Sequence, residues 1–553
     1  MKDIVLRKKF TFLAGFLIAI ASVSPARTQT RLTATDVQTI IAQAVSQAVA
    51  LNKKVTVAVN DKEGNLLGMF TMSGATSITL VRSVGKAGQG LENRFALATS
   101  AARSKSATAA IFSTGGNAFT TRTAGFIIQE HFPPGIDHRP GGPLYGVQFS
   151  SLTCSDISIE GLPLGLSGDP GGVPLYKDGV SVGGVGVEGD EMYTIDRIPT
   201  DQDQPIEEVI AVAASRGYEA PALIRADNIL VEGIRFPFAN VEGPAVVPTI
   251  PFAELPGNVT RIIRDAPPSD FIPGTLGGVS GSFSSRFPTV GSADLSAAET
   301  SQILADAIST ADRTRGAIRQ PIGSNARVTV AVVDTSGAVL GIFRQLDAPV
   351  FGLDVSVQKA RTSMFFARSD AGTKLQATGF GSYVARATAD GLSLNGSVAF
   401  SDRAFGFLHR PLFPDGINDT VAGPFSSLLA DWSPFNVGLQ LDMVSNAILF
   451  PSINCKAAAY GRAKRKFLAP CPCTAVPEVR NGLQIFAGGL PIYRGTKLVG
   501  AVGVSGDGID QDDFIAGGGA NTFAPAAEIR SDRTLVRGVR LPFLKFPARP
   551  TLP

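Results

Sequence analysis

The sequence predicts an α+β protein made of two tandem copies of one domain, each an antiparallel sheet with helices packed on it. Three observations carry this prediction. Short sequence blocks recur in the same order in both halves, and they alternate between helix-like and hairpin-like patterns. A stretch rich in Pro, Gly and Ser separates the halves. We place the first copy at 32–245, a linker at 246–292 and the second copy at 293–545.

The opening block of each copy predicts an amphipathic helix. Apolar residues recur at helical spacing in both blocks. Thr33 with Asp36, and Ser296 with Glu299, have the spacing of a capping box, in which side chains bind the free amides of the first turn. The predicted helices span 33–50 and 296–311.

The next block predicts a β-hairpin in each copy. Val55–Phe70 and Val328–Phe343 each contain two β-branched runs around an Asp-x-x-Gly sequence. The aspartate can accept hydrogen bonds from turn amides, and the glycine can adopt positive φ. We therefore interpret Asp61 and Asp334 as turn formers and not as catalytic acids.

The remaining blocks predict a second helix, a second hairpin, a third helix and a last strand. The second helix begins with Lys105 in the first copy and with Lys359 in the second. Glycines alternate with valines in the second hairpin, which favours close packing of a helix on the strand over a phosphate-binding loop. The matched pairs are Lys105–Phe112 with Lys359–Phe366, Phe119–Phe126 with Phe400–Phe407, Phe132–Asp137 with Phe413–Asn418, Gly171–Tyr176 with Gly488–Tyr493, Gly183–Asp190 with Gly500–Asp507, Glu207–Ala211 with Asp512–Ala516, and Val231–Phe238 with Val536–Phe543.

The N-terminus predicts a bacterial-type secretory signal peptide at 1–26. Four basic residues precede the apolar run Phe10–Val23, and Ser24 and Ala26 supply small residues for cleavage after Ala26. The run is short for a membrane span, although an uncleaved anchor is the alternative. No cysteine lies near the cut, which disfavours a lipoprotein anchor. We expect a secreted or periplasmic protein that has no membrane segment after cleavage.

Composition and charge narrow the classes of partner. Apolar residues make up 44% of the chain and charged residues 18%, as in soluble proteins. The formal net charge is +3, and the leader alone carries four basic residues and one acidic residue, so the mature chain is near neutral. This balance gives no electrostatic support for binding nucleic acid or an anionic membrane.

The four cysteines are too few for a disulfide framework in a chain of this size. Cys455, Cys471 and Cys473 cluster in an insertion of the second copy, at about 426–487, and Cys154 stands apart. A disulfide from Cys455 to Cys471 or Cys473 is one expectation, and metal binding by the Cys-Pro-Cys sequence is a weaker one. The sequence does not fix the pairing.

The matched blocks resemble the GlcG/HbpS-like family, which also includes the C-terminal domain of PduO-type proteins. The second copy carries nearly the whole family pattern, whereas the first has Glu188 where the family has serine. The residues that carry the resemblance are Lys359, Ala360, Thr362, Gly488, Gly489, Pro491, Ile492, Gly500, Gly503, Val504, Ser505, Gly506, Asp512 and Asp513. The resemblance implies a profilin-like fold, a tendency to form homo-oligomers, and binding of haem or another tetrapyrrole in some members.

Some family members bind haem through a histidine on an early helix, but the first helices here contain none. The three histidines of the chain are His131, His138 and His409. His409 is unique to the second copy, where the alignment places it opposite Ile128, and it is our candidate iron ligand among several nearby phenylalanines. His131 is a second candidate, and a loop histidine without a ligand is the alternative for each.

Two pairs of basic residues occupy matching positions in the copies. Arg122 and Arg403 can bind a haem propionate, or can pair with a nearby acid. Lys105 and Lys359 can contact the same ligand, or can form structural ion pairs.

Two functions therefore follow from the sequence. The first is an exported haem-binding protein. The second is a non-catalytic structural or protein-interaction module that binds no cofactor, in which the two copies form an internal pseudo-dimer. An enzyme is the least favoured class, because the sequence presents no nucleophile or acid–base pair.

Overall fold

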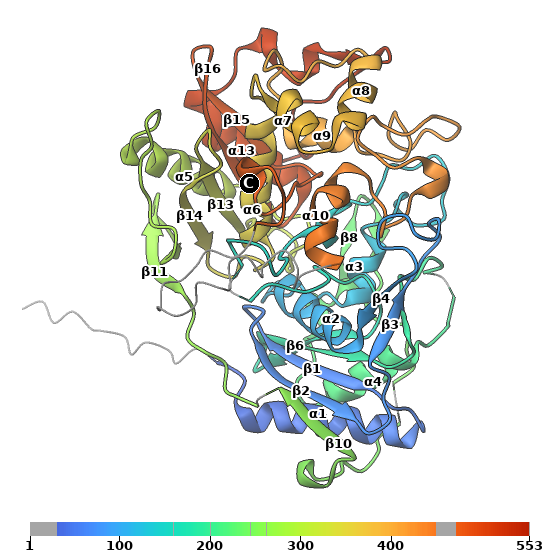
Figure 1. Cartoon of the computed structure of the whole chain (residues 1–553). Coiled ribbons are helices and arrows are strands. Elements are labelled where there is room, and N and C mark those ends of the chain that lie inside the picture. Colours follow the sequence, from blue (N-terminus) through green and yellow to red (C-terminus); the bar gives the residue numbers. More distant parts are fainter. Residues whose placement is uncertain are drawn as a thin grey trace, which may run out of the picture. The chain divides into compact units, whose positions relative to one another are not determined.

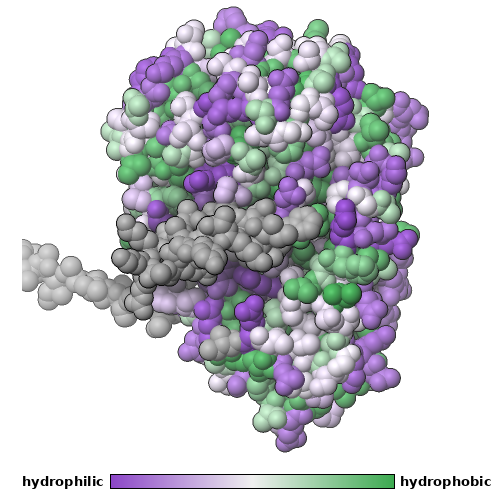
Figure 2. Space-filling model, in the orientation of Figure 1, coloured by the Kyte–Doolittle hydropathy of each residue, from purple (hydrophilic) through white to green (hydrophobic). Residues whose placement is uncertain are grey.

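The computed structural model describes residues 30–158, 160–199, 201–243, 245–261, 263–449 and 472–551. The predicted signal peptide, Cys455 and Cys471 lie outside these residues. Residues from Arg31 onward form one compact unit. No helix in the described part is long and apolar enough to cross a membrane. On the face in Figure 2, hydrophilic and hydrophobic residues are intermixed.

The elements of the first copy follow the predicted order. They are α1 (Ala34–Ala50), β1 (Thr56–Asp61), β2 (Leu66–Met72), β3 (Ile78–Val81), β4 (Arg94–Leu97), α2 (Ala98–Phe112), α3 (Thr121–Phe126), β5 (Gly172–Lys177), β6 (Val180–Glu188), β7 (Met192–Tyr193), α4 (Ile206–Ala214), β8 (Leu230–Val231) and β9 (Ile234–Arg235). The small sheet β4-β3-β7 has no equivalent among the described strands of the second copy.

The second copy repeats this plan with extra helices. Its elements are α5 (Ala297–Ala311), β13 (Val328–Val333), β14 (Val339–Gln345), α6 (Gly352–Phe366), α7 (Ala371–Ala377), α8 (Gly381–Ala389), α9 (Asp402–Phe407), α10 (Leu439–Leu449), β15 (Gly489–Arg494), β16 (Lys497–Gly506), α13 (Ile509–Ala520), β17 (Leu535–Val536) and β18 (Val539–Arg540). Helix α10 lies in the predicted insertion at about 426–487.

The α+β prediction is confirmed, and the two main sheets share one strand order. The first sheet contains β2-β1-β6-β5 and the second contains β14-β13-β16-β15, with every neighbouring pair antiparallel. Helices cover both faces of each sheet: α1 and α4 pack on one face of the first, and α2 packs on the other (Figure 1). Strands β1 and β13 are consequently buried along their whole length.

The local predictions for the first helix and the first hairpin are also confirmed. Both capping boxes form at the starts of α1 and α5. The Asp61 carboxylate accepts hydrogen bonds of 2.9 Å from the backbone N–H groups of Glu63 and Asn65. The Asp334 carboxylate does the same for Ser336 and Ala338, at 2.8 and 3.0 Å.

The predicted linker is partly a set of strands. Strand β10 (Gly257–Arg261) pairs with β2, and β11 (Phe271–Leu276) and β12 (Val279–Ser284) extend the second sheet through β14. An existing sheet edge supplies backbone partners, so a segment of weak intrinsic β-propensity can become a strand. The segment 246–292 thus completes both sheets as well as joining them.

Two other boundaries differ from the prediction. Helices α2 and α6 begin seven residues before Lys105 and Lys359, so these lysines lie in mid-helix. Each predicted last strand is instead a two-residue hairpin, β8–β9 or β17–β18. The turns Glu232-Gly233 and Arg537-Gly538 have positive φ at both residues, which reverses the chain where the sequence pattern suggested continuation.

Glycines in β6 and β16 allow the second helices to lie close to the sheets, as the sequence predicted. A Cβ atom at Gly186 would lie 2.3 Å from the carbonyl oxygen of Ala102 in α2. A Cβ atom at Gly503 would lie 1.9 Å from the carbonyl oxygen of Ser356 in α6. Larger residues would push the helices away, so these glycines set the depth at which the two helix lysines are buried.

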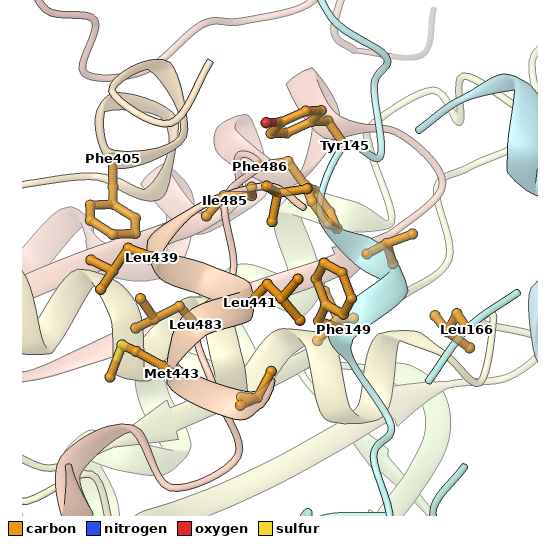
Figure 3. Close-up of a cluster of buried hydrophobic side chains, with 14 of the residues drawn as sticks. Tyr145, Phe149, Leu166, Phe405, Leu439, Leu441, Met443, Leu483, Ile485 and Phe486 are labelled. Atoms are coloured by element: carbon orange, nitrogen blue, oxygen red, sulfur yellow. The ribbon is translucent and has the colours of Figure 1, made fainter. Parts of the chain in front are cut away.

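The two copies share one hydrophobic cluster, to which α2 and α6 both contribute. Figure 3 shows Phe149 of the first copy beside Leu441 of the second, and Tyr145 of the first copy near Phe486 of the second. Ion pairs support this contact at its edges, since Arg344 donates two 2.8 Å hydrogen bonds to Glu63.

A disulfide joins Cys154 of the first copy to Cys473 of the second, across 319 residues of sequence. Pairing of Cys473 with Cys455 is therefore wrong as a prediction. Sequence proximity favoured the local pair, but the tertiary contact between the copies brings the distant cysteine nearer, with a Cα–Cα distance of 5.0 Å.

We predict that replacing both Cys154 and Cys473 by alanine lowers the free energy of unfolding by about 2–4 kcal/mol, because the cross-link restricts a long loop of the unfolded chain. Urea unfolding measures the loss. Reduction of the unmodified protein serves as the matched control and should give a similar shift. An unchanged midpoint with an unchanged denaturant dependence in both samples would contradict the prediction.

Candidate functional site

Lys105 lies at the centre of three buried carboxylates. Its Nζ is 2.7 Å from an Asp169 oxygen and 2.9 Å from a Glu188 oxygen, and it donates a hydrogen bond to Glu207. Burial alone would lower the pKa of Lys105, but the three acids together raise it well above its usual range. The ammonium occupies the point to which these carboxylates converge.

One ammonium does not balance three carboxylates, so the protonated forms of these acids are favoured relative to acids in water. Burial raises the pKa of Glu207 to about 8, against the opposing effect of Lys105. Burial also raises the pKa of Asp169 well above its usual value, and that of Glu188 above its usual value. Burial therefore raises the pKa of all three carboxyls around Lys105.

The small sheet of the first copy covers this cluster. Thr79 on β3 and Tyr193 on β7 are both buried, and neither hydroxyl has a partner at hydrogen-bonding distance and angle. The Thr79 hydroxyl lies against Glu188 and helps to lower the pKa of that acid, while burial raises the pKa of Tyr193 beyond its ordinary range. The extra sheet and the extra acids therefore occur together, in the first copy alone among the described residues.

The second copy has a simpler arrangement around Lys359. The Lys359 ammonium donates hydrogen bonds of 2.8 Å to Asp512 and to the carbonyl oxygen of Val504, and it lies 4.5 Å from the centre of the Phe486 ring. In the alignment, Phe486 replaces Asp169 and Ser505 replaces Glu188. One acid is therefore enough to pair this helix lysine.

A second buried carboxyl in this region has no partner. Asp402 begins α9, is fully buried, and neither of its carboxyl oxygens makes a hydrogen bond. Burial raises its pKa well above the usual range, so the neutral form is favoured.

Arg122 and Arg403 both pair with the acidic helix that follows the second hairpin. Arg122 Nε donates to both oxygens of Glu208, at 2.9 and 3.0 Å. Arg403 Nε donates to Asp513, which aligns with Glu208, and its Nη2 donates to Asp510 at 2.5 Å. The two lysines and two arginines predicted as ligand contacts therefore have acidic partners within their own copies.

His131 and His138 lie near the boundary between the copies. His131 Nδ1 is 2.7 Å from the carbonyl oxygen of Arg139. His138 is an exposed residue with φ of 56°, and its backbone N–H donates to the Asn418 side chain of the second copy. The structure does not bring either of them together with His409.

His409 follows α9 and is completely buried. Its Nδ1 is 3.0 Å from the carbonyl oxygen of Phe405, which fixes the tautomer with the proton on Nδ1. Nε2 makes no hydrogen bond and keeps its lone pair. Burial lowers the pKa of His409 to about 3, so the imidazole is neutral.

Aromatic rings and one arginine surround this imidazole. Phe405 and Phe425 lie 4.3 and 5.4 Å from the His409 ring, measured between ring centres. The next residue, Arg410, stacks on Tyr145 of the first copy at 4.5 Å. Its Nε lies 3.5 Å from an Asp415 oxygen, and Nε and Nη1 make no hydrogen bond. Trp432 Nε1 donates to the Tyr145 hydroxyl, which donates to the carbonyl oxygen of His409, at 2.7 and 3.1 Å.

A neutral imidazole nitrogen that is buried without a partner is a potential metal ligand, and the neighbouring guanidinium can bind a carboxylate. Sequence reasoning found His409 but missed Arg410 and Tyr145. The position of Arg410 next to His409 in the sequence could have identified it. Tyr145 belongs to the other copy, and nothing in the sequence linked it to His409. The acids around Lys105 were also missed, apart from the departure at Glu188.

Comparison with known proteins supports the expectation that the second copy preserves the family pattern better than the first. Residues 456–521 match the family model described as haem degrading protein HbpS-like. No curated protein matches the chain. The predicted resemblance to the GlcG/HbpS-like family is thus confirmed through the second copy.

Similar solved structures each correspond to about a third of the chain. A PduOC–haem complex is 19% identical and covers 35% of this chain and 98% of its own, with a TM-score of 0.23. The ORFY protein of Klebsiella pneumoniae is 18% identical and covers 35% and 97%, with a TM-score of 0.23. A double mutant of Streptomyces reticuli HbpS is 18% identical and covers 37% and 97%, with a TM-score of 0.20.

We predict that the Lys105 cluster makes the protein less stable as the pH rises. The pKa of Glu207 rises from an ordinary 4.5 to about 8, so the folded state binds this proton more tightly than the unfolded state. Its contribution is complete below pH 4.5 and disappears between pH 4.5 and 8. Urea unfolding of Glu207→Gln should therefore show a smaller fall in stability over this range than the unmodified protein.

Glu528→Gln is the control for this experiment, because Glu528 is an exposed acid outside the cluster. It should keep the pH dependence of the unmodified protein. Equal slopes for Glu207→Gln and the unmodified protein would show that Glu207 does not hold the proton.

Proposed function

We propose that this protein binds haem or a related tetrapyrrole, and that His409 would bind its iron. The observation that carries the proposal is the Nε2 atom of His409, a buried, neutral and unpartnered nitrogen among aromatic rings. The HbpS-like match in the same copy supports it. Haem, when bound, would supply an iron centre for ligand binding or redox chemistry.

The residues around His409 fit the chemistry of this group. Nε2 can bind the iron while Nδ1 holds the ring in place through Phe405. Arg410 Nη1 makes no hydrogen bond and can bind a propionate. An acid also lies near Arg410, with Asp415 3.5 Å from Nε, but Arg122 and Arg403 are less suited because they donate hydrogen bonds to their acids. Phe405 and Phe425 would supply apolar surroundings for the group.

Binding at this position requires a local opening, because His409 is fully buried. Phe425 covers it from a loop whose backbone is held by hydrogen bonds from Gly423 to Arg410 and from Phe425 to Leu408. Movement of this loop would expose Nε2 and Arg410 together. We therefore expect slow association and a single site in the second copy.

A non-catalytic two-copy scaffold is the second candidate. The observation that favours it is the shared hydrophobic cluster of the two copies, together with the ion pairs that engage Lys105, Lys359, Arg122 and Arg403. In this case the closed core around His409 would itself be the final state. The haem titration below distinguishes the two candidates.

We predict that haem titration of the unmodified protein gives a Soret band with a low-spin spectrum, because imidazole is a strong-field ligand. His409→Ala should weaken binding by about tenfold or more and change the spectrum. His131→Ala is the matched control and should leave both unchanged. An unaltered spectrum in His409→Ala would remove His409 as ligand, and no spectral change with the unmodified protein would favour the scaffold.

We also propose that the protein is exported, on the basis of the basic and apolar segments that precede Ala26. The mature chain should then begin at Arg27. Mass spectrometry of the protein recovered from the culture medium or periplasm measures this. Recovery there of a chain that still contains residues 1–26 would contradict cleavage, and recovery only from the cytoplasm would contradict export.

A further inference from the structure

A cavity of about 540 Å³ opens at the boundary between the two copies, away from His409. Its volume lies in the range of small-molecule sites. The residues that matter for the argument are Gly115 and Gly116 of the first copy, and Ser280, Arg319, Arg327 and Asp347. Both copies and the segment between them therefore contribute to its wall.

This cavity is not a feature of the domain that is duplicated. In the second copy, the loop 312–327 joins α5 to β13, whereas the first copy passes from α1 to β1 through only 51–55. Strand β12, which carries Ser280, comes from the segment between the copies. The cavity is thus made by parts added to the duplicated domain.

Arg319 forms a fixed part of the wall and is not available to a ligand. It is 7% exposed, and all three of its side-chain nitrogens donate hydrogen bonds. Nε donates to Asp507 at 2.5 Å, and Nη1 donates to Asp347 at 2.6 Å. Asp347 also accepts a 2.8 Å hydrogen bond from the backbone N–H of Gly115, so Arg319 and Gly115 together hold its carboxylate at the cavity.

Arg327 is the cation that remains available. Its side chain is 29% exposed, and its nearest acidic oxygen in the described residues belongs to Asp312 at 3.9 Å, which is too long for a hydrogen bond. Its backbone N–H donates a hydrogen bond to Asp507, which holds the backbone at the base of the side chain in place. A guanidinium in this position presents a planar pair of N–H donors, which suits a carboxylate or a phosphate.

The other polar groups limit what else the ligand contains. The Asp312 and Asp347 carboxylates are 42% and 46% exposed, and they can accept hydrogen bonds from hydroxyl groups. The same carboxylates would repel a molecule with several negative charges. The Ser280 hydroxyl is exposed at the wall and can donate or accept. The site therefore favours one acidic group combined with several hydroxyls.

We propose that this cavity binds a sugar acid or a similar polyhydroxy carboxylate. Arg327 holds the acidic group, while Asp347 and Ser280 hydrogen-bond to hydroxyls of the same molecule. The ligand lies against both copies and so bridges them. This inference does not depend on haem binding, because the cavity and His409 share no residue.

Isothermal titration of the mature full-length protein with D-glucuronate, D-glucose and inorganic phosphate tests the ligand class. Glucuronate should bind about tenfold or more tightly than glucose, because only glucuronate offers a carboxylate to Arg327. Phosphate should bind more weakly than glucuronate, since it has no sugar hydroxyls. Equal affinities for glucuronate and glucose, phosphate binding as tight as glucuronate, or binding of none of the three would overturn the proposal.

Three variants test the assigned position. Arg327→Gln should weaken glucuronate binding by about tenfold or more, and Ser280→Trp should block it by filling the cavity. Arg313→Gln is the matched control, because Arg313 is an exposed residue of the same loop that does not line the cavity. Thermal melting of each variant checks that it is folded. Unchanged binding in Arg327→Gln, or an equal loss in Arg313→Gln, would place the ligand elsewhere.

Discussion

The rest of the structure depends on the burial of α2 and α6 on both of their sides. Each helix packs on its own sheet through glycines of β6 or β16, and both helices contribute to the hydrophobic cluster that joins the copies. The two helix lysines lie on faces that are enclosed in this way, away from solvent. Lys105 and Lys359 are therefore completely buried, and each requires acidic partners from the same copy.

The two copies meet this requirement differently. The second copy pairs Lys359 with Asp512 and an aromatic ring, whereas the first copy surrounds Lys105 with three acids and covers them with a small sheet. The extra acids raise the electrostatic cost of the first copy unless they keep protons. The helix lysine is thus present in both copies, while the acids around it differ in number and position.

The contact between the copies also determines where the two candidate sites lie. Tyr145 of the first copy supports the backbone of His409 and stacks on Arg410 in the second, and the disulfide fixes the same boundary from another point. The polar cavity lies at this boundary as well, with Arg319 and Asp347 closing it against Gly115. A single copy would contain neither the complete surroundings of His409 nor the complete cavity.

The sequence by itself determined the repeat, the order of helices and hairpins, the capping boxes and the Asp-x-x-Gly turns, because these follow from local spacing and backbone chemistry. It also singled out Lys105, Lys359, Arg122, Arg403 and His409 as candidate ligand contacts. Tertiary structure decided their surroundings: which acids pair with each cation, that Cys154 binds Cys473, and that the segment 246–292 completes both sheets. These outcomes depend on contacts between residues far apart in the chain, and local patterns contain no information about which distant partner fills a given space.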